Sequence, residues 1–263
     1  MSHHIIEAKE LSYTYPDGTR AVRGVSFRIT HGESVGIVGE NGAGKSTLLL
    51  HFNGYLMPTL GNLRVGDVPL SPGTLAEVRR TVGMVFQDPD DQLFMPTVFQ
   101  DVAFGPVNLG LPAGEVERRV TDALETVGMA HLRERPPYRL SAGEKRAVAI
   151  ASVLSMSPNI LVMDEPSANL DPKSRRRLIK LLGGFEHTKI IATHDLDLVA
   201  DLCERTLVMH EGGLAADGAT MDILRNEELL TRCSLERPLR LQACPICSTR
   251  PATAAGDSPG LRL

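Results

Sequence analysis

The order of strand-like and helical patterns predicts an α/β protein with a mostly parallel sheet. Short strand-like runs open the chain, and an amphipathic helical stretch occupies its middle. In the second half, helical stretches alternate with short, continuously apolar runs. Because this alternation favours parallel strands and consecutive short strands favour antiparallel ones, we expect an antiparallel N-terminal part, a mostly parallel core sheet and a helical insert between them.

Length and composition limit the class of protein. Of 263 residues, 42% are hydrophobic and 23% are charged, as in ordinary globular proteins. The net charge of -4 gives no basic field for nucleic acid, and four cysteines are too few for a disulfide scaffold. No window reaches the roughly 18 uninterrupted apolar residues of a membrane-spanning helix. We expect a protein of a reducing compartment that binds no nucleic acid and does not cross a membrane by itself.

The first third of the chain is predicted to form strands. Residues 5–15, 21–29 and 34–39 are β-rich runs separated by turns that contain Pro and Gly. Residues 62–70 are expected to form a short strand pair, and 81–86 a buried strand.

Helices and buried strands alternate in the rest of the chain. Asp171 and Pro172 mark a helix start, as N-cap and first helical residue. The expected helices cover residues 113–129, 142–155, 172–183 and 195–203. The expected strands cover residues 160–164 and 189–193, followed by a hairpin over 206–216. Residues 238–263 are rich in Pro, Gly, Ser and Thr, which predicts a mobile and dispensable tail.

Residues 39–46 fit the pattern G-x-x-x-x-G-K-[ST] between an apolar strand and a helix. In that setting, glycines let backbone N–H groups surround phosphates, and the helix N-terminus adds positive potential. Lys45 is expected to reach the β- and γ-phosphates, and Ser46 to bind Mg²⁺. The predicted nucleotide-binding residues of this loop are Gly39, Glu40, Asn41, Gly42, Ala43, Gly44, Lys45, Ser46 and Thr47.

Asp164 and Glu165 stand at the end of the apolar run 160–164. Carboxylates at the end of a buried strand cost free energy unless a cation or a hydrogen-bond donor pairs with them. Beside a phosphate-binding loop, Asp164 is expected to orient Mg²⁺ and Glu165 to act as general base on the attacking water. Taken alone, the pair could equally well end a strand and begin a turn.

Ser141 and Glu144 have the S-x-x-E spacing of a capping box in front of a helical stretch. A capped helix N-terminus beside the unhindered Gly143 also presents donors to a phosphate, which can belong to another subunit. The two interpretations are compatible.

Together these motifs resemble the nucleotide-binding subunit of an ATP-binding-cassette (ABC) transporter. The loop 39–46, Gln87, LSAGE, LVMDEP, SANLD and His194 follow the family's order over about residues 5–230. The resemblance implies a RecA-like P-loop NTPase fold in a domain over residues 1–237, with a helical subdomain at about 90–157. It also implies ATP and Mg²⁺ as cofactors and a dimer of ATPase subunits, identical or paired with a sister ATPase. Integral membrane transport subunits would be further partners, with this subunit peripheral at the cytoplasmic face of the cell membrane.

Residue roles follow from the same resemblance. Gln87 would touch Mg²⁺ and water, Glu165 would be the catalytic carboxylate, and His194 would lie near the γ-phosphate. Ser141, Gly143 and Glu144 would face a nucleotide across the dimer, with Asp171 at the interface. Tyr15 matches the aromatic residue that stacks on adenine, with Tyr13 as a competing candidate. Ala142 and Glu144 depart from the usual LSGGQ, and capping of Ser141 is sufficient to explain Glu144.

The segment QDPDDQLF at 87–94, with TVFQDVAFGP after it, resembles energy-coupling-factor ATPases, especially those of cobalt and nickel importers. This resemblance implies an extra short helix that carries Gln92 at the surface coupled to the membrane subunits. A turn capped by Asp88 or Asp90 would explain the acidic segment without any partner. The solute itself, whether cobalt, nickel or a vitamin, does not contact the ATPase.

Other assignments fit less well. Soluble ABC-type ATPases of DNA maintenance carry a long coiled-coil insertion, and no sustained heptads lie between Lys45 and Leu140. A P-loop GTPase would need an N-K-x-D-type motif, which the sequence lacks, and neither a GTPase nor a small-molecule kinase would require LSAGE. Cys244 and Cys247 have metal-knuckle spacing, but with Cys233 they supply at most three ligands. They are either an unused pair or half of a site shared by two tails.

Overall fold

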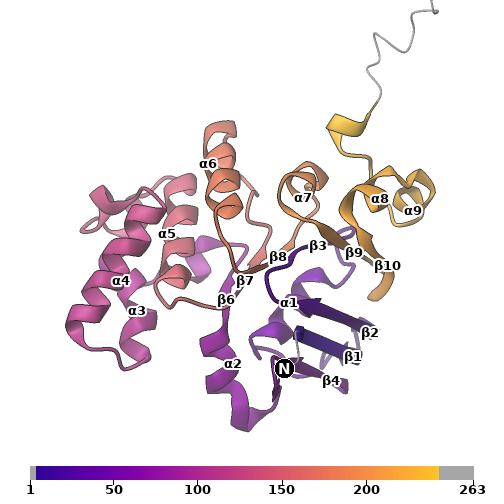
Figure 1. The fold of residues 1–263 in the computed structure, drawn as a ribbon, viewed down its shortest axis with the longest axis horizontal. Coiled ribbons are helices and arrows are strands. Elements are labelled where there is room, and N and C mark those ends of the chain that lie inside the picture. Colours follow the sequence, from indigo (N-terminus) through magenta and orange to yellow (C-terminus); the bar gives the residue numbers. More distant parts are fainter. Residues whose placement is uncertain (1–3, 243–263) are drawn as a thin grey trace, which may run out of the picture.

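The computed structural model describes residues 4–242, which build two β-sheets (Figure 1). The antiparallel sheet has the order β2-β1-β4-β5 and consists of β1 (His4–Thr14), β2 (Arg20–Thr30), β4 (Leu60–Val65) and β5 (Val68–Pro69). The core sheet has the order β10-β9-β3-β8-β7-β6. Its strands are β3 (Ser34–Val38), β6 (Val82–Val85), β7 (Ile160–Asp164), β8 (Thr188–Ala192), β9 (Arg205–His210) and β10 (Gly213–Ala219). Strands β9 to β6 are parallel and only β10 is antiparallel, so the expected α/β fold is confirmed.

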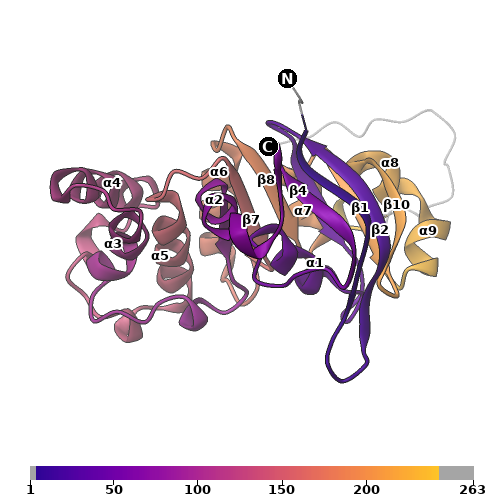
Figure 2. The same ribbon diagram turned by 90° about the horizontal axis from the view of Figure 1, so that it is seen from below.

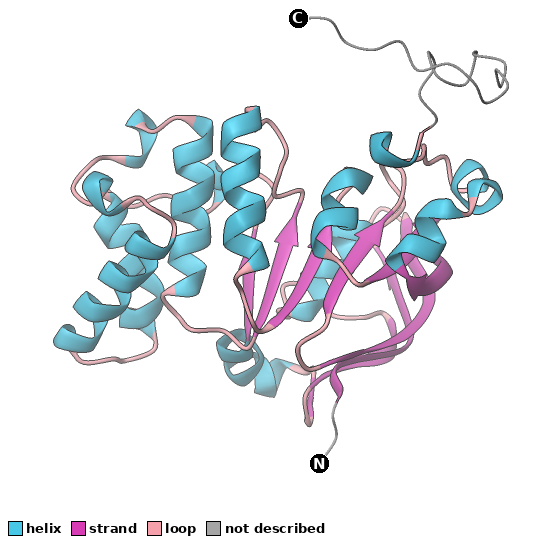
Figure 3. Cartoon of the chain, turned by 45° about the horizontal axis from the view of Figure 1, so that its top comes forward, coloured by secondary structure: helices cyan, strands magenta, loops and turns pink. Residues whose placement is uncertain are grey.

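Helices cover both faces of the core sheet and form a separate lobe beside it (Figures 2 and 3). The lobe contains α3 (Val98–Asn108), α4 (Ala113–Thr126) and α5 (Ala142–Leu154), which pack on one another. The remaining helices are α1 (Lys45–Phe52), α2 (Leu75–Thr81), α6 (Pro172–Gly183), α7 (Leu196–Leu202), α8 (Thr220–Arg225) and α9 (Glu227–Arg232). Asp171 caps α6 by accepting from the N–H groups of Lys173 and Ser174, as expected.

Two apolar clusters lie on opposite faces of the core sheet. Along β7, Ile160 and Val162 pack with α1 and the antiparallel sheet, whereas Leu161 and Met163 pack with α5, α6 and α7. Successive residues of a strand point to opposite faces, so a strand covered on both sides must be apolar throughout. This double burial explains the continuous apolar runs.

Near the end of the described residues, Leu239–Leu241 form a 3-10 turn held against α7. Asp197 accepts hydrogen bonds from the Leu239 N–H and from the Arg240 guanidinium, which also pairs with Asp201. The start of the predicted tail is therefore attached to the domain. Cys244, Cys247 and the rest of the tail lie outside the described residues, whereas Cys233 is fully buried in the apolar core.

Truncation at two positions tests the tail prediction. A chain ending at Gln242 is expected to keep the ATP turnover and melting temperature of the full chain. A chain ending at Pro238 also loses the two Arg240 ion pairs, surface contacts worth about 0–1 kcal/mol each, so its melting temperature should fall by no more than about 8 °C. A large loss of turnover or stability in the chain that ends at Gln242 would mean that the removed residues dock on the domain.

Candidate active site

Several of the predicted site residues lie at the carboxyl ends of three adjacent strands. The loop 39–46 follows β3, Asp164 ends β7 with Glu165 directly after it, and His194 follows β8, which lies between the other two strands. Carboxyl ends of parallel strands meet at one edge of the sheet, where α/β proteins bind their ligands. Segments far apart in the sequence therefore converge.

The loop 39–46 wraps around a buried lysine. The Lys45 ammonium donates to the carbonyl oxygens of Gly39, at 2.8 Å, and Glu40, at 3.0 Å. Burial lowers the pKa of Lys45, and nearby carboxylates, foremost that of Glu165, raise it in part. Gly44 begins α1 with φ 95°, and a Cβ there would lie 2.2 Å from the Ala21 carbonyl oxygen. Both observations require glycine at this position, as the phosphate-loop pattern predicts.

Asp164 is buried beside Ser46 and has an unused oxygen. Burial raises the pKa of Asp164, and the Ser46 hydroxyl and Lys45 lower it in part. Among the residues that the structure describes, none bonds to its Oδ1 atom. No group of three or more His, Cys, Asp or Glu side chains is clustered for metal binding within residues 4–242. A hydroxyl and one carboxylate fit Mg²⁺, which keeps waters and takes phosphate oxygens as further ligands.

Glu165 is buried, 6% exposed, and oriented by hydrogen bonds. Its Oε2 atom accepts from the Thr193 hydroxyl at 2.8 Å. Its Oε1 atom accepts from the His194 N–H at 3.0 Å and lies 2.8 Å from the His194 Nδ1 atom. The backbone of Glu165 has φ 44°, a left-handed conformation that costs a non-glycine residue about 1–2 kcal/mol. A carboxylate fixed in this way can accept a proton from a water in front of it.

The two tyrosines at the end of β1 have different contacts. The Tyr15 hydroxyl lies 3.0 Å from the Thr47 hydroxyl, directly after the phosphate loop. The Tyr13 ring is half-buried against the apolar core and packs edge-on against His51 and against the Tyr15 ring. Only Tyr15 thus contacts a residue of the predicted nucleotide-binding set through its hydroxyl, which favours Tyr15 for the adenine.

Sequence comparison identifies the family. The family described as ABC transporter matches residues 22–168, more than half of the chain. The chain belongs to this family. It is an ABC ATPase, and its fold is that of the ABC cassettes.

Individual relatives agree with this assignment. A putative ABC transporter ATP-binding protein of Geobacter sulfurreducens is 69% identical over 247 residues, which cover 94% of this chain and 99% of the relative. The energy-coupling factor transporter ATP-binding protein EcfA of Methanocaldococcus jannaschii is 47% identical, covering 89% and 86%. Among solved structures, CbiO1 of Clostridium perfringens, part of the CbiONQ transporter complex, has a TM-score of 0.78 at 42% identity, covering 88% and 94%. The dimeric cassette MJ0796, bound to ADP and phosphate, has a TM-score of 0.74 at 26% identity, covering 82% and 98%.

The LSAGE motif of this ABC ATPase lies on the helical lobe, at the start of α5. Ser141 and Glu144 form the expected capping box, with the Glu144 carboxylate accepting from the Ser141 N–H at 2.8 Å. The backbone and side chain of Ser141 lower the pKa of Glu144. Gly143 faces α6, where a Cβ would lie 2.5 Å from the Ser174 hydroxyl oxygen. The capping prediction is confirmed.

The acidic segment contains a 3-10 turn, Pro89–Asp91, capped by Asp88, which accepts from the Asp90 N–H. The expected short helix is therefore a single turn. Gln92 is turned inward: its amide nitrogen donates to the Ala149 carbonyl and the Ser152 hydroxyl, and its amide oxygen accepts from the Phe86 N–H. These three bonds satisfy the half-buried amide within the chain. Gln92 also lines the groove that contains Phe94 and Phe104, and its place at the coupling surface stays a prediction.

Gln87 is exposed after β6, and its side chain forms no hydrogen bond with any residue in the described range. Its backbone carbonyl accepts from Arg146 of α5 at 2.6 Å. The structure therefore brings together Lys45, Asp164, Glu165 and His194, but it does not place the Gln87 side chain in contact with them.

Sequence reasoning missed a groove of about 530 Å³ between α2, α3 and α5. Two aromatic rings on its wall, Phe94 and Phe104, are 62% and 43% exposed and meet edge to face with centroids 5.0 Å apart. Residues 94–104 contain several apolar side chains, but a short sequence pattern does not show whether such side chains are exposed to solvent or buried. Contiguous exposed apolar surface is a common feature of interaction sites.

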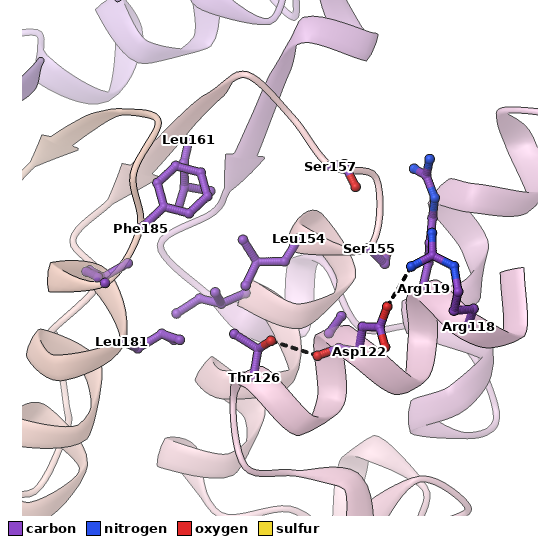
Figure 4. A pocket seen from close by; sticks show the side chains of 14 residues that line it. Arg118, Arg119, Asp122, Thr126, Leu154, Ser155, Ser157, Leu161, Leu181 and Phe185 are labelled. Atoms are coloured by element: carbon purple, nitrogen blue, oxygen red, sulfur yellow. Dashed lines mark hydrogen bonds and ion pairs between the residues drawn. The ribbon is translucent and has the colours of Figure 1, made fainter. Parts of the chain in front are cut away.

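A second cavity, of about 240 Å³, lies between α4, α5 and α6 (Figure 4). Leu154, Leu181 and Phe185 form its apolar wall, with Arg118 and Asp122 at its edge. The described lining contains none of the predicted site residues.

Within residues 4–242, no helix is long and apolar enough to cross a membrane.

Proposed function

We propose that this ABC ATPase powers an importer of the energy-coupling-factor type. The observation that carries the proposal is the buried Glu165 carboxylate, oriented by Thr193 and His194 next to the Lys45 loop. The relatives named EcfA and CbiO1 support the transporter type. We propose cobalt or nickel ions as the solute because residues 87–94 resemble the ATPases of such importers, with a vitamin as the alternative.

The residues of the loop would bind ATP. Backbone N–H groups of residues 39–46 and the Lys45 ammonium would contact the phosphates, and Tyr15 would stack on adenine. Ser46, Asp164 and Gln87 would hold Mg²⁺, which supplies positive charge to the β- and γ-phosphates when bound. The unpartnered, buried Asp164 oxygen supports this assignment.

Glu165 would accept the proton of the water that attacks the γ-phosphate. Thr193 and the His194 backbone hold its carboxylate, and the exposed His194 ring would contact the γ-phosphate. Phosphoryl transfer needs little covalent chemistry from a protein, so fixed positions and charge stabilisation supply most of the catalysis.

The second half of each nucleotide site would come from another subunit. In one chain, LSAGE lies on the helical lobe, whereas the phosphate loop lies on the core sheet (Figure 1). Ser141, Gly143 and Glu144 of one subunit would therefore face ATP held by the other, with Asp171 at the interface. The dimeric form of the related cassette MJ0796 supports this arrangement.

The groove at Phe94 and Phe104 would receive the integral membrane subunits, with the ATPase peripheral at the cytoplasmic face. We expect the double substitution Phe94→Ser and Phe104→Ser to abolish co-purification with these subunits, because it removes the exposed apolar surface. ATP affinity should stay within about twofold, since neither ring belongs to the phosphate loop. Pull-down in detergent and ATP titration measure the two quantities.

The matched control is Leu60→Ser, which changes an equally exposed apolar residue on the antiparallel sheet. Leu60→Ser should leave both the complex and the ATP affinity unchanged. An intact complex after the double substitution would refute the groove as the docking surface, and lost ATP binding would show that the rings support the fold.

A further inference from the structure

A buried arginine on α5 holds the backbone on either side of Gln87. Arg146 is 4% exposed, and its guanidinium donates to the carbonyl oxygens of Phe86, at 2.8 Å, and Gln87, at 2.6 Å. A planar guanidinium with two fixed donors can lock two successive carbonyls in one orientation. The contact sets the direction in which the chain leaves β6.

Two further contacts attach the following residues to the same helix. Lys145 pairs with both carboxylate oxygens of Asp90, at 2.5 and 2.9 Å. The Gln92 amide donates to Ala149 and Ser152, about one and two turns further along α5. The segment Phe86–Gln92 is therefore connected to α5 at three levels, and it cannot shift without moving the helix or breaking these contacts.

Stability does not explain the choice of arginine. The Nε atom of Arg146 is buried and unpaired in the described part of the chain. Burial lowers the pKa of Arg146, and Asp88, Asp164 and Glu165 offset only part of that effect. An apolar side chain of similar size is often at least as stabilising as a buried charge. An apolar residue could therefore also hold the lobe together, but it could not donate to the Phe86 and Gln87 carbonyls.

We propose that Arg146 is a positioning residue that fixes Gln87 relative to the Ser141–Glu144 end of α5. This inference rests on the proposed dimer, in which Gln87 faces the nucleotide of its own subunit and Ser141–Glu144 faces that of the other. Arg146 lies two residues after Glu144, so one rigid unit would carry a contact to each nucleotide. Each subunit would in this way connect the two nucleotide sites.

A double-mutant cycle tests the inference. In the full-length protein, Arg146→Met is expected to lower ATP turnover about tenfold, within the range found for residues that share a network. The ATP concentration at half-maximal turnover should change less than about twofold, since the phosphate loop is untouched. In a Gln87→Ala background, Arg146→Met should lower turnover by less than about twofold, because the residue that it positions is already absent. Arg146→Lys should restore part of the turnover, since an ammonium can still donate to a carbonyl.

The control is Arg205→Met. Arg205 also donates to a backbone carbonyl, that of Arg28, but it lies on β9, near the edge of the core sheet that is far from the helical lobe. Its effect should be the same with and without Gln87→Ala. If Arg146→Met fails to fold, Arg146→Lys replaces it in the cycle: it should lower turnover in the otherwise unchanged protein and lower it by less than about twofold in the Gln87→Ala background.

Additive effects of the Arg146 substitution and Gln87→Ala would overturn the role of Arg146 and leave the proposed function intact. The proposed function fails on a different result, normal turnover of Glu165→Gln.

Discussion

Replacing Glu165 with Gln is expected to lower ATP turnover by roughly 10²–10⁴-fold, the usual effect of losing a general base. The amide keeps the shape of the carboxylate: its oxygen can accept from the His194 N–H, and its nitrogen can donate to the Thr193 hydroxyl oxygen. It cannot take up a proton at neutral pH. ATP affinity should change little, because the loop and Lys45 are intact.

The dimer is a second readout of the same variant. If ATP holds two subunits together and hydrolysis separates them, slow hydrolysis should trap a dimer that size-exclusion chromatography with Mg-ATP detects. His194→Ala should lower turnover without abolishing binding. Glu117→Gln, at an exposed carboxylate of α4, is the matched control and should behave as the unchanged protein. Normal hydrolysis by Glu165→Gln would refute the assignment of the base.

Replacing Lys45 with Ala is expected to weaken ATP binding by roughly 10- to 100-fold, as for the loss of a hydrogen bond to a charged group. The ammonium is the cation at the centre of the loop, and without it the phosphates would approach the Asp164 and Glu165 carboxylates with less compensation. Dimer formation with ATP should be lost together with binding.

Lys189 provides the matched control for Lys45. It is also buried, and its ammonium also donates to a backbone carbonyl, that of Phe185, but it lies at the opposite end of β8 from the site. Lys189→Ala should lower the melting temperature and leave ATP affinity unchanged. Titration with a fluorescent ATP analogue compares the two variants. Equal affinities for both would show that Lys45 does not contact the phosphates.

The sheet could be predicted more fully than the helices, for physical reasons. Strands buried on both faces are apolar throughout, which makes a run such as 160–164 easy to recognise. Helix α3 was not predicted because Gly105 and Pro106 interrupt its pattern. Both residues lie in its last turn, and a Cβ at Gly105 would meet Met156 at 2.5 Å. Helices α2, α8 and α9 have six or seven residues, too few for a clear period. Helix α7 is equally short, but it follows directly after the recognisable buried strand at 189–193.

The site could be predicted in its residue types but not in its contacts. The phosphate loop consists of consecutive residues, so the spacing of its residues is enough to predict it from the sequence. The Glu165–His194 contact depends on the register of β7 and β8, in which the Glu165 N–H donates to the Ala192 carbonyl. Gln92 and Arg146 depend on partners about sixty residues away, and on sequence alone both are typical of a solvated surface.

The place of β3 in the core sheet affects how the protein can fold during its synthesis. Its two neighbours are β8 and β9, which both follow it by more than a hundred residues in the chain. A nascent chain that has emerged as far as β7 already contains the phosphate loop, Asp164 and Glu165, yet β3 has no strand to pair with. Unpaired strand edges are prone to association with other chains, and long-range pairing is slow. The nucleotide site can therefore be complete only when β8 and β9 have left the ribosome, and until then both edges of β3 are open to association with other chains.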